Sequence, residues 1–217
     1  VTLYPNSLII APIEPQVIPF PKPEITPPKT KIYFILHNIK YYFNIEYYLI
    51  LNNDTVVTNN FLEKLYLDAM KNGCHHIYGP KIKYINTDKL WFSGGYYNKY
   101  LGSTKHIGIR KSEDNIFYKS RETNYISGCC MLIKKDLIDR LEGFSKVYNM
   151  YYEDVDLCYR ASLLGIKCYL VEDSFIFHNV SYSIGNNSIS KMYYQFASRL
   201  KFIFKSNNII IFLFSLL

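Results

Sequence analysis

The pattern of apolar and polar residues is organised around Tyr47–Thr55, where an apolar run of strand length ends abruptly in Asn52, Asn53 and Asp54. A continuous Tyr/Leu/Ile run predicts a strand buried on both faces, as in a parallel sheet covered by helices. In such sheets, ligands bind beyond the carboxyl ends of the strands. A carboxylate and two amides there could bind a hard cation, which in turn could bind phosphates. The alternative is that Asp54 or Thr55 is the N-cap of the next helix.

The other apolar segments predict further strands and helices in alternation. Apolar residues at helical spacing indicate helices, and short apolar runs bounded by Gly or Pro indicate strands. The predicted helices span 59–72, 135–142, 153–164 and 190–205. The predicted strands span 31–36, 47–51, 77–85, 89–92, 123–133, 167–171 and 174–178. Residues 96–121 are polar and irregular, which favours a long surface or functional loop.

The two ends of the chain differ from the middle. Residues 1–30 hold eight of the nine prolines, which predicts an extended arm with little core. The folded domain is expected over 31–205, followed by an apolar tail at 206–217. Ile209–Leu217 is strongly apolar but far shorter than the ~20 residues that cross a bilayer. The tail is therefore either the start of a membrane segment, a peripheral membrane contact, or part of a helix packed on the domain.

Composition narrows the class of ligand and the compartment. The formal charge of +7 suits an anionic ligand, a nucleic acid or a membrane surface, but Lys and Arg are spread along the chain and no nucleic-acid motif is present. The five cysteines match no zinc spacing, so we expect them to be reduced core residues. Because no signal peptide is recognisable, a cytoplasmic protein is expected, at the cytoplasmic face of the membrane if the tail contacts lipid.

A second acidic cluster occupies the start of the predicted helix at 153–164, where Glu153, Asp154 and Asp156 follow Tyr151 and Tyr152. Acidic residues in a first turn often only complement the helix dipole and cap exposed N–H groups. The functional alternative is that one of these carboxylates faces a cleft and accepts a proton from a hydroxyl group. The neighbouring aromatic rings would then enclose it on one side and raise its pKa.

Other candidates are a histidine and two small-residue segments. His178 follows an apolar run, which is typical of a structural residue, yet together with Asp54 it would give a divalent metal two protein ligands. Ser127-Gly128 and Ser93-Gly94-Gly95 indicate either a close ligand contact or tight packing. Cys74-His75-His76 has no acidic partner nearby and is not expected to bind metal.

In this order and spacing, the segments together resemble the family 2 glycosyltransferases of GT-A fold, especially the rhamnosyltransferase-like branch. The resemblance covers about 44–205. The matching segments are Leu49–Thr55, Gly79–Ile82, Trp91–Gly95, Tyr125–Ile133, Gly143-Phe144 and Tyr151–Arg160, with Gly165 and His178 behind them.

The resemblance implies an α/β fold, with a mostly parallel, Rossmann-like sheet flanked by helices. It also implies an inverting, metal-dependent glycosyltransferase of cell-wall or polysaccharide biosynthesis that moves a hexosyl or rhamnosyl group from a nucleotide diphosphate sugar to a glycan or lipid-linked acceptor. Asn52 and Asp54 correspond to the D-x-D motif, in which Asp54 would bind Mg²⁺ or Mn²⁺ and His178 would be a further ligand on the metal side.

The same resemblance assigns the acceptor side of the site. Asp154 would be the general base that deprotonates the acceptor hydroxyl, and Glu153 would support it. Ser127 and Gly128 would lie near the donor sugar and the acceptor. The chain departs from the family at its start, because the proline-rich arm stands where much of the N-terminal nucleotide-binding half is expected. The alternative function is therefore a truncated, catalytically inactive domain that binds a glycan or a protein partner.

Overall fold

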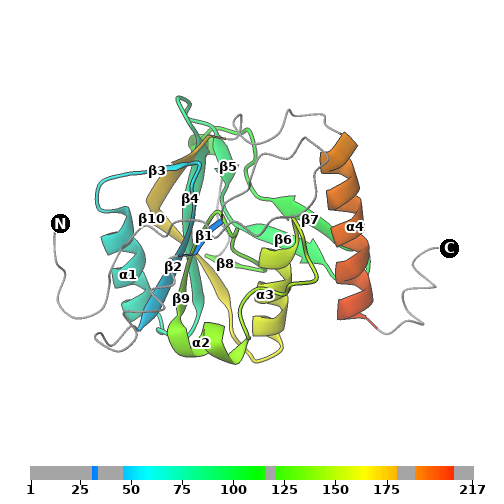
Figure 1. The fold of residues 1–217 in the computed structure, drawn as a ribbon. Helices are drawn as coiled ribbons and strands as arrows, with labels where there is room; N and C mark the ends of the chain where they lie inside the picture. Colours follow the sequence, from blue (N-terminus) through cyan, green and yellow to red (C-terminus); the bar gives the residue numbers. More distant parts are fainter. Residues whose placement is uncertain (1–30, 34–45, 116–120, 180–188, 208–217) are drawn as a thin grey trace.

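A mixed β-sheet forms the centre of the protein, and helices cover both of its faces (Figure 1). The computed structural model describes residues 31–33, 46–115, 121–179 and 189–207. Within these ranges the large sheet has the order β1-β2-β9-β4-β10-β3, with β5 beside β4 and β8 beside β10. Its strands are β1 Lys31–Tyr33, β2 Tyr47–Asn52, β3 Thr55–Val57, β4 Ile77–Tyr84, β5 Leu90–Phe92, β8 Glu122–Thr123, β9 Cys130–Lys134 and β10 Cys168–His178.

The strand directions correct the expectation of a mostly parallel sheet. Among the described strand pairs only β4–β10 is parallel, and β9 is inserted antiparallel between β2 and β4. Because β9 opposes both neighbours, β2, β4 and β10 still run in one direction. Their carboxyl ends, at Asn52, Tyr84 and His178, therefore lie at the same edge of the sheet. The sheet is mixed, but the edge at which a ligand was expected is preserved.

The helices are α1 Phe61–Lys71, α2 Lys135–Arg140, α3 Glu153–Ser162 and α4 Ile189–Ser206, and a short 3₁₀ helix spans Glu113–Asn115. Figure 1 shows α1 on one side of the large sheet and α3 and α4 on the other. The side that α1 turns to the sheet carries Phe61, Leu65 and Ala69, which are four residues apart and buried. All four predicted helices are confirmed, with small differences at their ends.

The structure also rules out the capping interpretation of Asp54 and Thr55. Helix α1 begins at Phe61 with Asn60 as its N-cap, and it is preceded by β3, which contains Thr55. Asp54 lies in the turn between β2 and β3, six residues before that cap. Its position is set by strand pairing rather than by helix formation.

Three predictions about local structure were wrong. The single strand predicted over 123–133 is two strands, β8 and β9, separated by residues 124–129. Residues 96–121 were predicted as a loop, but they contain most of a hairpin formed by β6 Gly95–Asn98 and β7 Ser103–His106. Its strands carry few apolar residues and are largely exposed, so the sequence lacks a strand pattern there. The two strands predicted over 167–178 form the single strand β10, which has a register shift between Val171 and Phe175.

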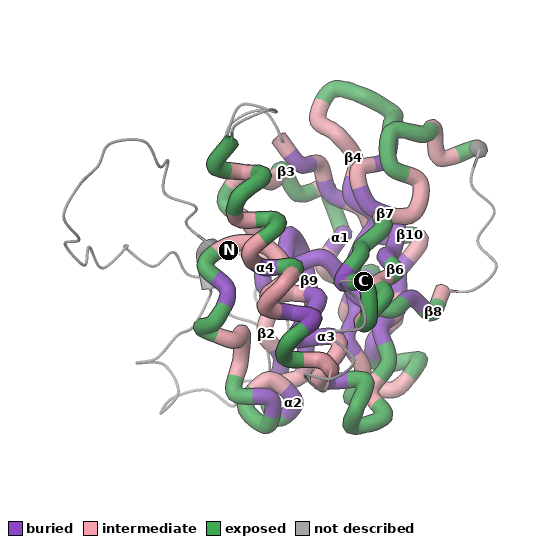
Figure 2. The backbone as a smooth tube through the Cα atoms, turned by 90° about the vertical axis from the view of Figure 1, so that its right-hand side faces the viewer, coloured by how far each residue is buried: buried purple, intermediate pink, exposed green. Residues whose placement is uncertain are grey.

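The core lies between the sheet and its helices and is concentrated in β4, β9 and the buried residues of β10 on either side of Glu172 and Asp173 (Figure 2). Two glycines allow close packing there. A Cβ on Gly79 would overlap Ile126, and a Cβ on Gly95 would overlap the Tyr125 ring. None of the five cysteines, all of which lie in the described residues, forms a disulfide. Four are buried as predicted, but Cys74 is partly exposed, so the prediction of a core position was wrong for Cys74.

The predicted proline-rich arm at 1–30 lies outside the described residues, as does most of the apolar tail. In the segments that the structure covers, no helix is long and apolar enough to span a bilayer.

Candidate active site

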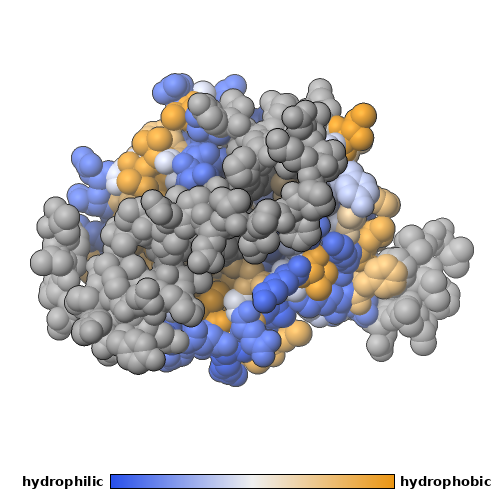
Figure 3. All heavy atoms as spheres, viewed as in Figure 1, coloured by the Kyte–Doolittle hydropathy of each residue, from blue (hydrophilic) through white to orange (hydrophobic). Residues whose placement is uncertain are grey.

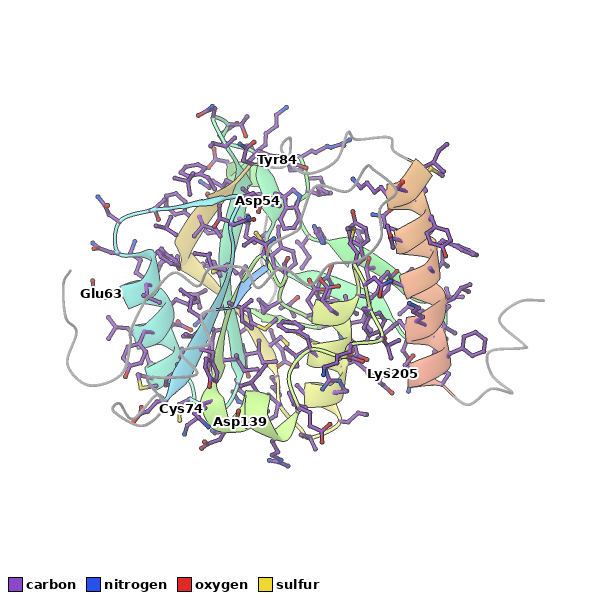
Figure 4. All side chains as sticks on the ribbon, viewed as in Figure 1. Asp54, Glu63, Cys74, Tyr84, Asp139 and Lys205 are labelled. Atoms are coloured by element: carbon purple, nitrogen blue, oxygen red, sulfur yellow. The ribbon has the colours of Figure 1, made fainter. Side chains whose placement is uncertain are left out.

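Asp54 is held at the carboxyl-terminal edge of the sheet by backbone and side-chain contacts. Its carbonyl oxygen accepts a hydrogen bond from the Asn179 N–H at 2.9 Å, and the Thr55 hydroxyl closes the turn by donating to the Asn52 carbonyl at 2.6 Å. The Asp54 Oδ2 atom lies 3.2 Å from His178 Nε2, and both side chains are largely buried. Figure 4 shows Asp54 near Tyr84 at this edge, with Cys74 and Asp139 at the opposite end of the sheet.

The residues around Asp54 are suited to bind a divalent cation whose remaining ligands come from another molecule. A carboxylate and an imidazole are suitable ligands for such an ion. The Asn52 Oδ1 and His178 Nδ1 atoms are buried and have no hydrogen-bond partner in the part of the chain described here. No three His, Cys, Asp or Glu side chains in these ranges are grouped as a metal site. A cation here would therefore need further oxygen ligands from a substrate such as a diphosphate, or from water.

Asp154 lies in the first turn of α3 and is tied to the same edge of the sheet. Its Oδ2 atom accepts a hydrogen bond from the Gly128 N–H at 2.9 Å, and its Oδ1 atom accepts one from the Val155 N–H at 2.8 Å. Tyr151 and Tyr152, which precede the helix, both have left-handed backbone conformations, with φ values of 66° and 68°. Such conformations are strained for bulky residues and are most frequent at functional sites.

Strand pairing brings Asp54 and Asp154 to one edge of the sheet, although they are a hundred positions apart in sequence. The Asn52 N–H donates to the Cys129 carbonyl at 2.9 Å, which places the Asp54 turn beside the segment that precedes β9. Gly128 in that segment donates to Asp154. Two consecutive hydrogen bonds thus connect the turn that holds Asp54 with the Asp154 carboxylate.

Aromatic rings form a second connection between the two carboxylates. The Trp91 ring meets the His178 ring edge-on at a centroid distance of 4.6 Å and the His106 ring at 4.8 Å. Burial lowers the pKa of His106, whereas the Trp91 carbonyl and the charge of Asp154 act in the opposite direction. Because the Trp91 carbonyl can only accept, the His106 Nδ1–H donates to it at 3.2 Å. His106 therefore lies within electrostatic range of Asp154, while its neighbour Trp91 contacts His178.

His106 was not predicted as a site residue. It lies on β7, in the region predicted as a loop, and a single histidine in a polar segment carries no distinguishing signal. The nearest candidate segment in the sequence was the Ser93-Gly94-Gly95 turn, which Trp91 precedes. There, Gly95 makes room for Tyr125, whose ring is 6.1 Å from that of His106.

The remaining predicted site residues have different surroundings. The Ser127 hydroxyl oxygen is buried and accepts a hydrogen bond from the Cys129 N–H at 3.2 Å, so it stabilises a turn. Glu153 is half-buried in the first turn of α3, beside Tyr151, whose pKa is raised by burial and by the Glu153 charge. Asp156 is buried and bound by Arg160 and Lys205, so its surroundings are those of a structural residue.

Comparison with known proteins identifies the family of the chain. Residues 47–199 match the model of "Glycosyl transferase family group 2". The rhamnosyltransferase WbbL of Escherichia coli K12 is 32% identical over 83 residues, which are 37% of this chain and 30% of the relative. The N-acetylglucosaminyl-diphospho-decaprenol L-rhamnosyltransferase of Mycobacterium tuberculosis is 31% identical over 72 residues, or 33% of this chain and 24% of the relative. The matches thus span less than a third of each relative.

The fold has a counterpart among solved structures. The crystal structure of GalNAc-T7 with UDP, GalNAc and Mn²⁺ aligns with a TM-score of 0.51 at 14% identity, over 74% of this chain and 31% of that one. This similarity supports a GT-A-like fold. Together with the family match, which includes both Asp54 and Asp154, it identifies the chain as a member of glycosyl transferase family group 2.

Proposed function

We propose that the chain transfers a sugar, with inversion, from a nucleotide diphosphate sugar to a hydroxyl of a glycan or lipid-linked acceptor. The observation that carries the proposal is the placement of two carboxylates at one edge of the sheet, Asp54 beside an imidazole and Asp154 at a helix start. Glycosyl transfer needs these two functions, one to bind the leaving diphosphate and one to activate the acceptor. The rhamnosyltransferase names of two distant relatives make nucleotide-activated rhamnose the first donor to test.

In the proposed reaction, Asp154 accepts the proton of the acceptor hydroxyl as the oxygen attacks the anomeric carbon. Its hydrogen bonds to the Gly128 and Val155 N–H groups fix the orientation of the carboxylate, and each oxygen retains lone-pair capacity for that proton. Attack opposite the bond to the diphosphate breaks that bond and inverts the configuration at the anomeric carbon.

Asp54 and His178 would hold Mg²⁺ or Mn²⁺, which stabilises the negative charge that develops on the departing diphosphate. The Asn52 amide oxygen lies in the same turn and is available to the cation or to its phosphate ligands. The hydrogen bonds of Thr55 and Asn179 keep this turn in place.

The test is release of nucleoside diphosphate from a panel of nucleotide sugars, with Mn²⁺ and a lipid-linked or free glycan acceptor. We expect Asp54→Ala to abolish release and Asp154→Asn to lower its rate by about 10²–10⁴-fold. Asp139→Asn serves as the matched control, because this carboxylate lies at the opposite end of the sheet (Figure 4). Unchanged release in Asp154→Asn would refute the assignment of the base. No release and no nucleotide binding in calorimetry would support the alternative, a non-catalytic binding domain.

A further inference from the structure

Helix α4 carries large apolar side chains on its outward face. Ile189, Met192, Tyr193 and Phe196 are spaced i, i+3, i+4 and i+7, and are 86%, 68%, 66% and 61% exposed. Phe204, on the same side near the end of the helix, is 46% exposed. We call these five residues the outer stripe. Figure 3 shows apolar side chains along the right-hand edge of the molecule, where Figure 1 places α4.

Some polar side chains of α4 contact the domain, although Gln195, Arg199 and Lys205 are exposed. The Ser198 hydroxyl donates to the Met150 carbonyl at 2.6 Å, and Lys205 Nζ lies 2.9 Å from Asp156 Oδ1. Arg199 donates to the Leu101 carbonyl at 2.9 Å, and Phe202 is fully buried beside these contacts. The buried residues of α4 are Ser198, Phe202 and Ile203, so large apolar side chains occur on its packed face and also on its exposed face, where polar residues are usual. These contacts fix the rotation of α4 with the outer stripe exposed.

The charge of α4 indicates what covers the outer stripe. The helix contains four basic residues, Lys191, Arg199, Lys201 and Lys205, and no acidic residue. A second copy of the chain, also with a charge of +7, would bring two such helices together and would be repelled. Arg199 and Lys205 remain exposed beside their contacts with the domain, and exposed apolar and aromatic side chains near basic residues are typical of helices that lie in the interface of an anionic bilayer.

The sequence beyond α4 has the same character. After Asn207 and Asn208, all of residues 209–217 except Ser215 are apolar. A second apolar segment this close in sequence favours an extended lipid surface over a small soluble ligand.

We propose that α4 binds peripherally to an anionic lipid bilayer, with Met192, Tyr193 and Phe196 inserted among the headgroups. The proposal does not depend on sugar transfer. It would nevertheless place the candidate site close to the bilayer, because Ser198 bonds to Met150, four residues before Asp154. An acceptor with a lipid tail could then present its hydroxyl group from the membrane.

The test is flotation of the full chain with phosphatidylcholine vesicles that contain or lack phosphatidylglycerol. The stripe variant is Met192→Ser/Tyr193→Ser/Phe196→Ser. The matched control is Leu67→Ser/Met70→Ser/Leu163→Ser, which removes three exposed apolar side chains from other surfaces. We expect the chain to bind the anionic vesicles, with binding lowered more than about tenfold in the stripe variant and unchanged in the control. Added salt should weaken binding.

Three results would overturn the proposal. The first is equal binding by the stripe variant and the unmodified chain. The second is loss of binding only in a tail variant, Phe212→Ser/Phe214→Ser/Leu216→Ser, which would make the tail the membrane contact. The third is a dimer in light scattering that the stripe variant dissociates, since the outer stripe would then bind a second copy. Circular dichroism of each variant confirms that it is folded, so that lost binding can be assigned to the surface.

Discussion

Replacing Asp156 with alanine is expected to destabilise the protein strongly, although the residue makes no contribution to the proposed reaction. Its side chain is buried, and its Oδ2 atom lies 2.7 Å from Arg160 Nε. Its Oδ1 atom lies 2.9 Å from Lys205 Nζ and accepts a hydrogen bond from the Tyr148 hydroxyl at 3.3 Å. Arg160 also donates to the Leu141 and Gly143 carbonyls. One carboxylate therefore connects α3, α4 and the segment after α2.

The expected loss is about 3 kcal/mol. Removing one partner of a buried ion pair costs about 3–5 kcal/mol, because the other charge stays buried without compensation. The lower end applies here, since the side chains of Arg160 and Lys205 are 21% and 36% exposed and remain partly hydrated. For a protein of this size, about 3 kcal/mol corresponds to a fall in Tm of about 6–12 °C.

The measurement is urea denaturation followed by circular dichroism, with Asp139→Ala as the matched control. Asp139 is paired with Lys135 at the same i,i+4 spacing, but its side chain is 49% exposed, so its loss should cost less than about 1 kcal/mol. Similar losses of unfolding free energy in both variants would refute the reasoning, because burial would then not govern the strength of the pair.

Three other predictions concern packing, pH and thiol reactivity. Gly95→Ala should destabilise the protein by more than about 2 kcal/mol in the same assay, since its Cβ would overlap the buried Tyr125 ring. Burial raises the pKa of Glu113, but hydrogen bonds from Lys81 and Lys83 outweigh this and lower it below its ordinary 4.5. The ion pairs of Glu113 should stabilise the protein above about pH 4.5, and this stabilisation should be lost as the pH falls further. Glu113→Gln should therefore reduce the fall of the urea midpoint between about pH 4.5 and lower pH. A thiol reagent should label mainly Cys74 in the native protein and all five cysteines in urea, because the other four are buried.

Much of the candidate site could be predicted because its residues stand at element boundaries. Asp54 follows an apolar run and Asp154 begins a helix, so both had distinctive local sequence patterns. The direction of β2, β4 and β10 then places their carboxyl ends at one edge, as expected for a parallel sheet. The shared edge is kept although the sheet is mixed, because β9 changes the pairing and leaves the direction of these three strands unchanged.

The parts that sequence could not predict depend on pairing between distant segments. The β6–β7 hairpin is polar and mostly exposed, so no apolar alternation marks it. His106 gains its significance only because that hairpin places it beside Trp91. The exposed apolar side chains of α4 were equally hidden, since an amphipathic pattern shows that two faces differ but not which residues pack on the domain.

Helix geometry explains how the acidic cluster at the start of α3 serves two purposes. Residues two positions apart on a helix point about 200° away from each other. Asp154 therefore points to the sheet edge and bonds to Gly128, whereas Asp156 points to the other side and binds Lys205 of α4. A single rigid turn thus connects the candidate base with the helix proposed to bind lipid. A surface that positions α4 on a membrane would position Asp154 with it, because the Asp156–Lys205 pair joins the two helices.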